Sequence, residues 1–195
     1  MGIHRLAKVV LASTLMLVAS CGINSIPTAE ETAKARWADV QNEYQRRADL
    51  IPNLVATVKG YAAQEKAVLT QVTEARAKAT AINVTTDDLS NPERLRQFGE
   101  AQNQLTQALG QLRTVVEAYP DLKSNQNFLT LQAQIEGTEN RISVARRDYN
   151  AAVQDYNTKI RTFPDAIGAK AIYGAKPMVT FEAAGGADKA PSVAF

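Results

Sequence analysis

The chain has 195 residues, 45% of them hydrophobic, which suits one folded domain with short appendages. Its single Cys and single His exclude a disulfide framework, a Cys/His zinc site and any chemistry that needs two imidazoles. Without Arg5 and Lys8 of the amino-terminal segment, 20 of the 22 basic residues remain against 20 acidic ones. A chain so close to neutral lacks the basic surface of a nucleic-acid-binding protein.

Residues 1–20 have the pattern of a secretory signal peptide. Two basic residues and no acid lie in the first eight positions, an almost unbroken apolar run covers 9–18, and small residues follow. This run is shorter than the roughly 20 apolar residues that a membrane-spanning helix needs. The sequence Val18-Ala19-Ser20-Cys21 resembles the lipobox of bacterial lipoproteins, in which the Cys becomes the lipidated first residue. We therefore predict lipidation of Cys21; the alternative is a buried structural Cys near the end of the signal.

The residues after Cys21 predict where the lipidated chain resides. Gly, Asn, Ser and Pro occur within 21–27, which indicates a short tether between the anchor and the folded domain. Gly22 stands where an Asp would signal retention in the inner membrane. We therefore expect a membrane-bound, lipid-anchored protein that faces the periplasm, with the outer membrane favoured in a Gram-negative cell.

Hydrophobic residues repeat every seven positions over 28–164, and this period predicts helices. Four long helical segments are predicted, at 28–50, 53–81, 92–118 and 124–162. Their connections are short, and short connections place successive helices side by side in opposite directions. The predicted fold class is therefore all-α, an antiparallel up-and-down helical bundle. An irregular carboxy-terminal tail over 165–195 follows, and its residues 172–181 are expected to lie against the bundle.

The first two segments keep one heptad phase in spite of Pro52. An interior Pro costs a helix about 3 kcal/mol and leaves one carbonyl, here that of Ala48, without its helical donor. Two alternatives follow: one long helix kinked at Pro52, or two antiparallel helices joined by a turn at 50–53. Arg47 and Glu65 occupy seam positions and are expected at the seam edge, with their charged ends in water. The apolar seam residues here are Trp37, Val40, Tyr44, Ile51, Leu54, Val58, Val72 and Ala79.

The later segments have clear start and stop signals. Ser90 or Asn91 is a candidate N-cap before Pro92, and Pro120 and Pro164 end the third and fourth segments. The third seam reads Leu95, Gln102, Leu109 and Val116, with Phe98, Leu105, Leu112 and Tyr119 beside it. The last helix has the series Phe128, Ile135, Ile142, Tyr149, Tyr156 and Phe163. The predicted core contains Ile135, Ile142 and Tyr149 together with Leu105, Leu109 and Leu112.

Several long motifs carry a family resemblance. The chain contains Arg46-Arg47-Ala48-Asp49-Leu50-Ile51-Pro52-Asn53-Leu54-Val55, Val58-Lys59-Gly60-Tyr61, Val72-Thr73-Glu74-Ala75-Arg76 and Glu117-Ala118-Tyr119-Pro120-Asp121-Leu122-Lys123, followed by Ala145-Arg146-Arg147-Asp148-Tyr149-Asn150. Over residues 30–164 this order of motifs closely resembles the LemA family. The resemblance implies a membrane-attached bacterial helical bundle without an established biochemical activity. Many relatives have a His where this chain has Gln64, so no role for that His is expected here.

Catalytic chemistry finds little support in the sequence. His4 lies within the predicted signal and Cys21 is predicted to carry lipid, so Ser/His/Asp and Cys/His catalysis are excluded from the mature chain. A di-metal carboxylate bundle needs Glu-x-x-His pairs, and none can be written. We therefore expect no enzyme activity, no metal and no cofactor. The alternative is an envelope-acting carrier or a carboxylate-based hydrolase that uses a groove between helices. The pairs Asp148/Asp155 and Glu136/Glu139 have the spacing to share a helix face.

The segment 46–55 is predicted to have a structural role at the Pro52 bend. Its apolar members belong to the seam, and Asn53 can cap the helix that follows a break at Pro52. A surface pair between Arg46 and Asp49 would contribute only about 0.2–0.5 kcal/mol, so an outward-facing recognition role is the alternative. In that alternative Arg46, Asp49 and Asn53 form the interaction surface. We predict a lipid-anchored scaffold or adaptor with an unidentified envelope protein partner.

Overall fold

The computed structural model describes residues 24–181, and its regular secondary structure in that range is helical throughout. The prediction of an all-α fold is confirmed. The long helices are α2 (Ser25–Tyr61), α3 (Lys66–Ala81), α4 (Pro92–Val116) and α6 (Gln126–Lys159). The short elements are the 3₁₀ helix η1 (Thr86–Ser90), α5 (Pro120–Lys123), α7 (Asp165–Gly168) and the π-helical turn η2 (Ala169–Tyr173).

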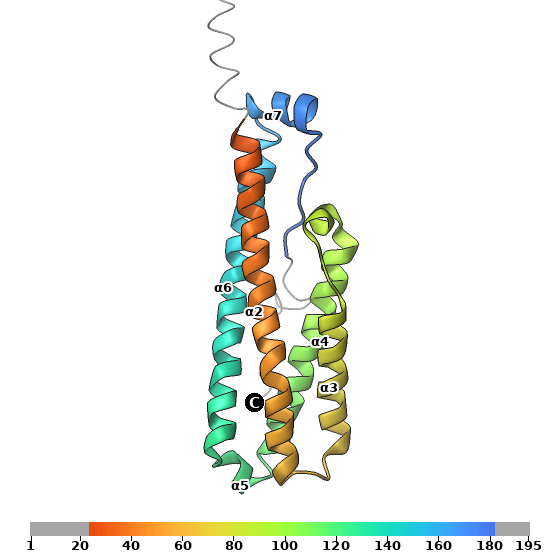
Figure 1. Ribbon diagram of the computed structural model, residues 1–195, viewed down its shortest axis with the longest axis vertical. Coiled ribbons are helices and arrows are strands. Elements are labelled where there is room, and N and C mark those ends of the chain that lie inside the picture. The colour runs from red at the N-terminus through yellow and green to blue at the C-terminus, as the bar shows by residue number, and fades with distance from the viewer. Residues whose placement is uncertain (1–23, 182–195) are drawn as a thin grey trace, which may run out of the picture.

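The four long helices lie along one axis, and each runs opposite to the one before it (Figure 1). The main interfaces join α2 to α6, α3 to α4 and α2 to α3. At a rise of 1.5 Å per residue, α2 and α6 are about 55 and 50 Å long, whereas α3 and α4 are about 24 and 37 Å long. The shorter pair therefore leaves the amino-terminal part of α2 and the carboxy-terminal part of α6 to be covered by other segments.

Helix α2 continues through Pro52 and ends at Tyr61, so the predicted turn at 50–53 is wrong. A single kinked helix reaching 81 is wrong as well, because residues 62–65 separate α2 from α3. The carbonyl of Ala48, which lacks a helical donor because of Pro52, accepts a hydrogen bond of 2.7 Å from Arg76 Nε on α3. Arg76 on α3 thus supplies the hydrogen bond that the Ala48 carbonyl loses because of Pro52, and α2 continues without a break.

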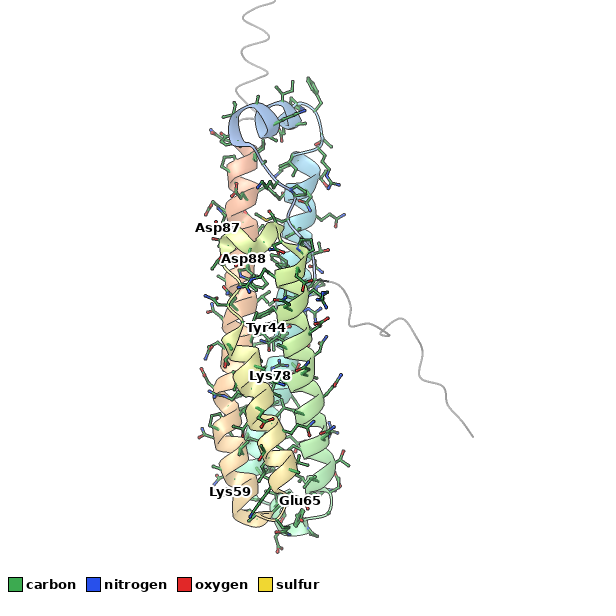
Figure 2. The ribbon with its side chains drawn as sticks, turned by 90° about the vertical axis from the view of Figure 1, so that its right-hand side faces the viewer. Tyr44, Lys59, Glu65, Lys78, Asp87 and Asp88 are labelled. Atoms are coloured by element: carbon green, nitrogen blue, oxygen red, sulfur yellow. The ribbon has the colours of Figure 1, made fainter. Side chains whose placement is uncertain are left out.

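The connections to α4 and α6 use side-chain caps. Asn91, rather than Ser90, caps α4, since its side chain accepts hydrogen bonds from the backbone N–H groups of Glu93 and Arg94. Pro92 takes the first helical position, as predicted. Before this cap, Thr85 precedes η1 as its N-cap residue, and its backbone N–H and hydroxyl both donate to the Asp88 carboxylate. Asp87 and Asp88 mark this connection in Figure 2.

The predicted domain limits differ from the structure at both ends. Ser25, Ile26 and Pro27 already belong to α2, so the predicted tether at 21–27 overlaps the helix. The predicted signal peptide and Cys21 lie outside the described residues. At the other end, α6 stops at Lys159, and Phe163, predicted on the buried seam, is 78% exposed. The predicted irregular tail begins with the helical elements α7 and η2 before the chain becomes extended over 174–181.

The segment 174–181 contributes Met178 and Phe181 to the core. It descends from the α7 end between the α2–α6 pair and the α3–α4 pair (Figure 1). Asn157 and Asn150 on α6 each exchange two hydrogen bonds with its backbone, at Met178 and at Phe181. Seven helical residues rise about 10.5 Å and three extended residues about 10 Å, so the two amides match the two backbone positions. The expected contact of 172–181 with the bundle is therefore made by its later residues, whereas Ile172 is exposed.

The core consists of two hydrophobic clusters. The cluster nearer the α7 end is aromatic, with the Trp37 ring 5.4–5.6 Å from the rings of Phe98, Tyr149 and Phe181. The other cluster is mainly aliphatic and contains Ile51, Leu54, Val58, Leu105, Leu112, Val116 and Ile135. The predicted core residues Ile135, Ile142, Tyr149, Leu105 and Leu112 are buried, and Leu109 is half-buried against the second cluster.

We predict that Ile142→Ala lowers the free energy of unfolding by about 2–5 kcal/mol, the range for truncating a well-packed aliphatic side chain. Ile142 is 4% exposed in the aromatic cluster. Val144 lies on the same helix but is 39% exposed, so Val144→Ala should change stability by no more than about 0.5 kcal/mol. Urea unfolding followed by circular dichroism measures both, and equal losses would contradict the assigned core face.

Candidate functional site

A buried polar layer, centred on Arg47 of α2, separates the two hydrophobic clusters. The Arg47 side chain is 1% exposed, which corrects the expectation that its charged end lies in water. Its Nη1 donates to Glu139 Oε1 of α6 at 2.6 Å and to Thr106 Oγ1 of α4 at 2.9 Å. Its Nη2 donates to Gln102 Oε1 of α4 at 2.7 Å. The neighbouring helices offer enough acceptors to keep this guanidinium inside the bundle.

The same layer reaches the fourth long helix through Gln102. The Gln102 side-chain amide donates to the carbonyl of Ala79 on α3 at 3.2 Å. Arg47 and its partners therefore link α2, α3, α4 and α6 at one level of the bundle. The sequence carries a signal for this layer, because Arg47 and Gln102 are polar residues at predicted seam positions.

One donor in the layer is left over. Arg47 Nε is buried, and no acceptor for it occurs among the described residues. The guanidinium also lies 5.2 Å from the centre of the Tyr44 ring, and burial raises the pKa of the Tyr44 hydroxyl. A neutral ring face against a guanidinium is a favourable contact. Arg47 is thus held by hydrogen bonds on one side and by an aromatic ring on another.

An open groove lies beside the polar layer, between α4 and α6. These helices share no interface as extensive as the other three, and segment 174–181 covers only the part nearer α7. On the side of the layer farther from α7, a cavity of about 210 Å³ remains. Its walls are mainly apolar and come from Leu54, Leu109, Leu112, Phe128 and Ile135. Polar side chains border it: Thr106, Gln132, Glu136, Glu139 and Arg113.

The chemistry of this groove suits binding better than acid–base catalysis. Glu139 is engaged by Arg47, and Glu136 accepts a hydrogen bond of 3.0 Å from Gln132. The walls between these carboxylates are mainly apolar. An apolar cavity bordered by a few polar groups that are already engaged is typical of a binding site.

The predicted interaction residues lie together on the exposed side of α2. Arg46, Asp49 and Asn53 are all exposed. Asp49 accepts a hydrogen bond of 2.7 Å from Gln45 and not the predicted one from Arg46. Asn53 lies inside the continuous helix, so the predicted role as a cap after Pro52 is wrong. The structure thus brings the three residues onto one surface, where nothing among the described contacts requires their identities for folding.

The end of the bundle opposite α7 is held by a small polar network. Glu65, predicted at the seam edge, precedes α3 and accepts a hydrogen bond of 2.7 Å from the Tyr119 hydroxyl. Gln64 donates to the same hydroxyl at 2.9 Å. The bond to Glu65 raises the pKa of Tyr119. Figure 2 shows Lys59 and Glu65 at this end. Gln64 lies in the connection between α2 and α3, and its hydrogen bond to Tyr119 joins that connection to the residue before α5.

Residues 24–181 provide neither a metal site nor a membrane-spanning helix. No group of three or more His, Cys, Asp or Glu side chains is arranged there to hold a metal ion. No helix in that range combines the length and the hydrophobicity that a bilayer crossing requires.

We predict that Arg47→Ala lowers the free energy of unfolding by about 3 kcal/mol, because it leaves Gln102 and Glu139 without their cation. This is the lower end of the range for breaking a buried pair, since the Glu139 side chain is 38% exposed and stays in contact with water. The neighbouring Arg46→Ala is a matched control that should cost no more than about 0.5 kcal/mol. Chemical denaturation measures both, and similar values for the two variants would contradict a structural polar layer.

Comparison with known proteins places the chain among bacterial relatives. It is 26% identical over 180 residues to magnetosome protein MamQ 2 of Paramagnetospirillum magneticum, and the aligned region covers 83% of this chain and 66% of the relative. It is 32% identical over 121 residues to protein LemA of Metamycoplasma hominis, with 62% of this chain and 51% of the relative covered. Magnetosome protein MamQ of Magnetospirillum gryphiswaldense is 25% identical over 180 residues, with coverage of 84% and 65%.

The chain spans about half to two thirds of the length of these curated relatives. The sequence profile of the LemA family matches residues 36–195, a range that includes the polar layer, the groove and segment 174–181. This match extends the resemblance found in the motifs of residues 30–164. The chain belongs to the LemA family.

Proposed function

We propose that the protein is a lipid-anchored scaffold or adaptor at the membrane surface of the bacterial cell envelope, without catalytic activity. The observation that carries this proposal is the position of α2, which begins at Ser25, four residues after Cys21. A lipid on Cys21 would therefore be joined almost directly to a long helix. Lipoprotein processing adds several acyl chains, and more than one chain is needed for stable attachment.

A short link between anchor and helix makes the bundle a spacer of defined height. In this proposal the four long helices act as an antiparallel up-and-down bundle that faces the periplasm. Arg46 lies 21 residues after the start of α2, which corresponds to about 30 Å along the helix. The surface formed by Arg46, Asp49 and Asn53 would then be presented to an envelope protein at a fixed distance from the bilayer.

A second candidate function, a carrier for envelope material, is favoured by the cavity between α4 and α6. Its volume of about 210 Å³ and its apolar walls suit part of an apolar molecule. The hydrolase form of this alternative lacks support, because Glu139 is engaged by Arg47 and Glu136 by Gln132. The scaffold remains the preferred function, since it uses the anchor position and the exposed α2 surface together.

We predict that Cys21 is the first residue of the mature protein and carries lipid, because it follows a signal sequence and a lipobox-like motif. Mass spectrometry of the protein purified from its own membrane would then find a lipid-modified Cys21 and no Met1. Cys21→Ser should abolish the modification and alter processing while thermal unfolding of the bundle stays the same. An intact amino terminus or an unmodified Cys21 would refute the anchor.

We predict that Arg46→Ala and Asp49→Ala reduce the capture of an envelope protein partner without changing thermal unfolding. Both side chains are exposed on α2, so their truncation should leave the fold intact. Crosslinking in cells, followed by purification of the anchored protein, measures the association. Lys78→Ala, on the exposed side of α3, is a matched control for the loss of one surface charge. Unchanged partners with unchanged unfolding would rule out recognition by this surface.

A further inference from the structure

The end of the bundle at which α2 begins carries a group of exposed apolar side chains. Phe163, Ile167, Ile172 and Tyr173 are 78%, 63%, 60% and 39% exposed. They account for four of the seven large hydrophobic residues that are exposed within 24–181. A group of exposed apolar side chains, as opposed to scattered single ones, indicates a surface that contacts another molecule or a membrane. We call these four residues the apical patch.

The apical patch is held close to the first residues of α2. Ser25 donates a hydrogen bond of 2.7 Å to the Asp165 carboxylate of α7. Gly168 lies beside Ile26, since a Cβ at Gly168 would be in ordinary van der Waals contact with the Ile26 side chain at 3.8 Å. Ala169 of η2 is buried in the aromatic cluster. Figures 1 and 2 show α7 and the following turn across the end of the bundle at which α2 begins. Helix α2 begins at Ser25, four residues after Cys21 in the sequence.

The segment that carries the apical patch is basic, while Glu30 and Glu31 near the start of α2 are paired with Lys34. Residues 160–181 contain three exposed cations, Arg161, Lys170 and Lys176, and a single acid, Asp165. Asp165 is engaged by Ser25. Apolar side chains bordered by Lys and Arg are the composition that binds the interface of an anionic bilayer. Two copies of such a surface would repel each other, so its charge fits anionic lipid better than a second copy of the chain.

We propose that the apical patch inserts into the headgroup region of an anionic bilayer, on the membrane that holds the lipid anchor. This inference rests on the proposed function, because the lipid on Cys21 brings the patch to the membrane. Phe163, Ile167, Ile172 and Tyr173 enter the interface, while Arg161 and Lys170 meet the phosphate groups of the lipids. Two separate contacts with the bilayer then fix the direction of the bundle, and the Arg46 surface stands away from the membrane.

The test places a fluorescent reporter at each end of the bundle. Ile172→Trp marks the apical patch, and Tyr61→Trp is the matched control, since Tyr61 is 45% exposed at the end of α2 farthest from α7. Trp37 is buried and gives the same background in both proteins. The lipid-modified full chain is reconstituted in vesicles of phosphatidylglycerol and brominated phosphatidylcholine. We expect a blue shift and a loss of fluorescence for Ile172→Trp and neither change for Tyr61→Trp.

Lys170→Glu, added to the Ile172→Trp protein, should reduce the loss of fluorescence on these vesicles by weakening the attraction to anionic lipid. Thermal unfolding checks that each variant folds. If Ile172→Trp does not fold, Ile167→Trp takes its place as the reporter in the apical patch. Lipidated protein whose reporters at 167 and 172 keep their fluorescence would overturn the membrane contact and leave the anchor intact. Reporters shielded in a dimer, detected by light scattering, would also overturn it.

The failure of the anchor gives a different result from the failure of the patch. If mass spectrometry finds no lipid on Cys21, the proposed function fails, and the same proteins are mixed with the vesicles without an anchor. Quenching of Ile172→Trp and not of Tyr61→Trp would still support the membrane contact. Equal fluorescence of the two proteins with and without brominated lipid would overturn it.

Discussion

Arg47 is a cation in the middle of the bundle, and the arrangement of the four long helices depends on how its charge is satisfied. Its guanidinium bonds to Glu139 of α6 and to Gln102 and Thr106 of α4, and Gln102 in turn bonds to the backbone of α3. An unpaired buried charge is far more costly than an unfilled apolar contact, so few relative positions of the helices can satisfy this layer. Apolar clusters on either side tolerate small shifts more readily, because their contacts have no direction. The polar layer therefore selects the level at which the helices meet, while the clusters supply most of the burial.

Differences in helix length explain the groove and the carboxy-terminal segment together. Helices α3 and α4 are too short to cover α2 and α6 completely, and α4 does not close against α6. Segment 174–181 covers the part nearer α7, where Asn150 and Asn157 hold its backbone and Met178 and Phe181 enter the core. On the side of the polar layer farther from α7, no described segment fills the space between α4 and α6, and a cavity remains. The incomplete contact between α4 and α6 thus leaves a packed region near α7 and an open groove on the other side of the polar layer.

The two ends of the molecule differ in chemistry, which gives the bundle a direction. The end near α7 has exposed apolar side chains, exposed cations and the beginning of α2. The opposite end has a polar network among Gln64, Glu65 and Tyr119. A bundle that stands on a membrane needs such a difference, because only one end meets lipid. The proposed membrane contact rests on this difference, whereas the proposed scaffold rests on the position of α2 relative to Cys21, so the two proposals fail in separate measurements.

Features that depend on neighbours along the chain could be predicted from the sequence. The period of seven predicted helices and the buried faces of Ile135, Ile142 and Tyr149, and local signals predicted Pro92 at the start of α4 with Ser90 or Asn91 before it. Pro52 also showed which carbonyl would lack a donor. The fold alone shows that Arg76, from another helix, supplies that donor and that α2 continues to Tyr61. It likewise decided that Arg47 is buried and that residues 174–181 enter the core, because their partners lie on helices far away in the sequence and no local pattern specifies them.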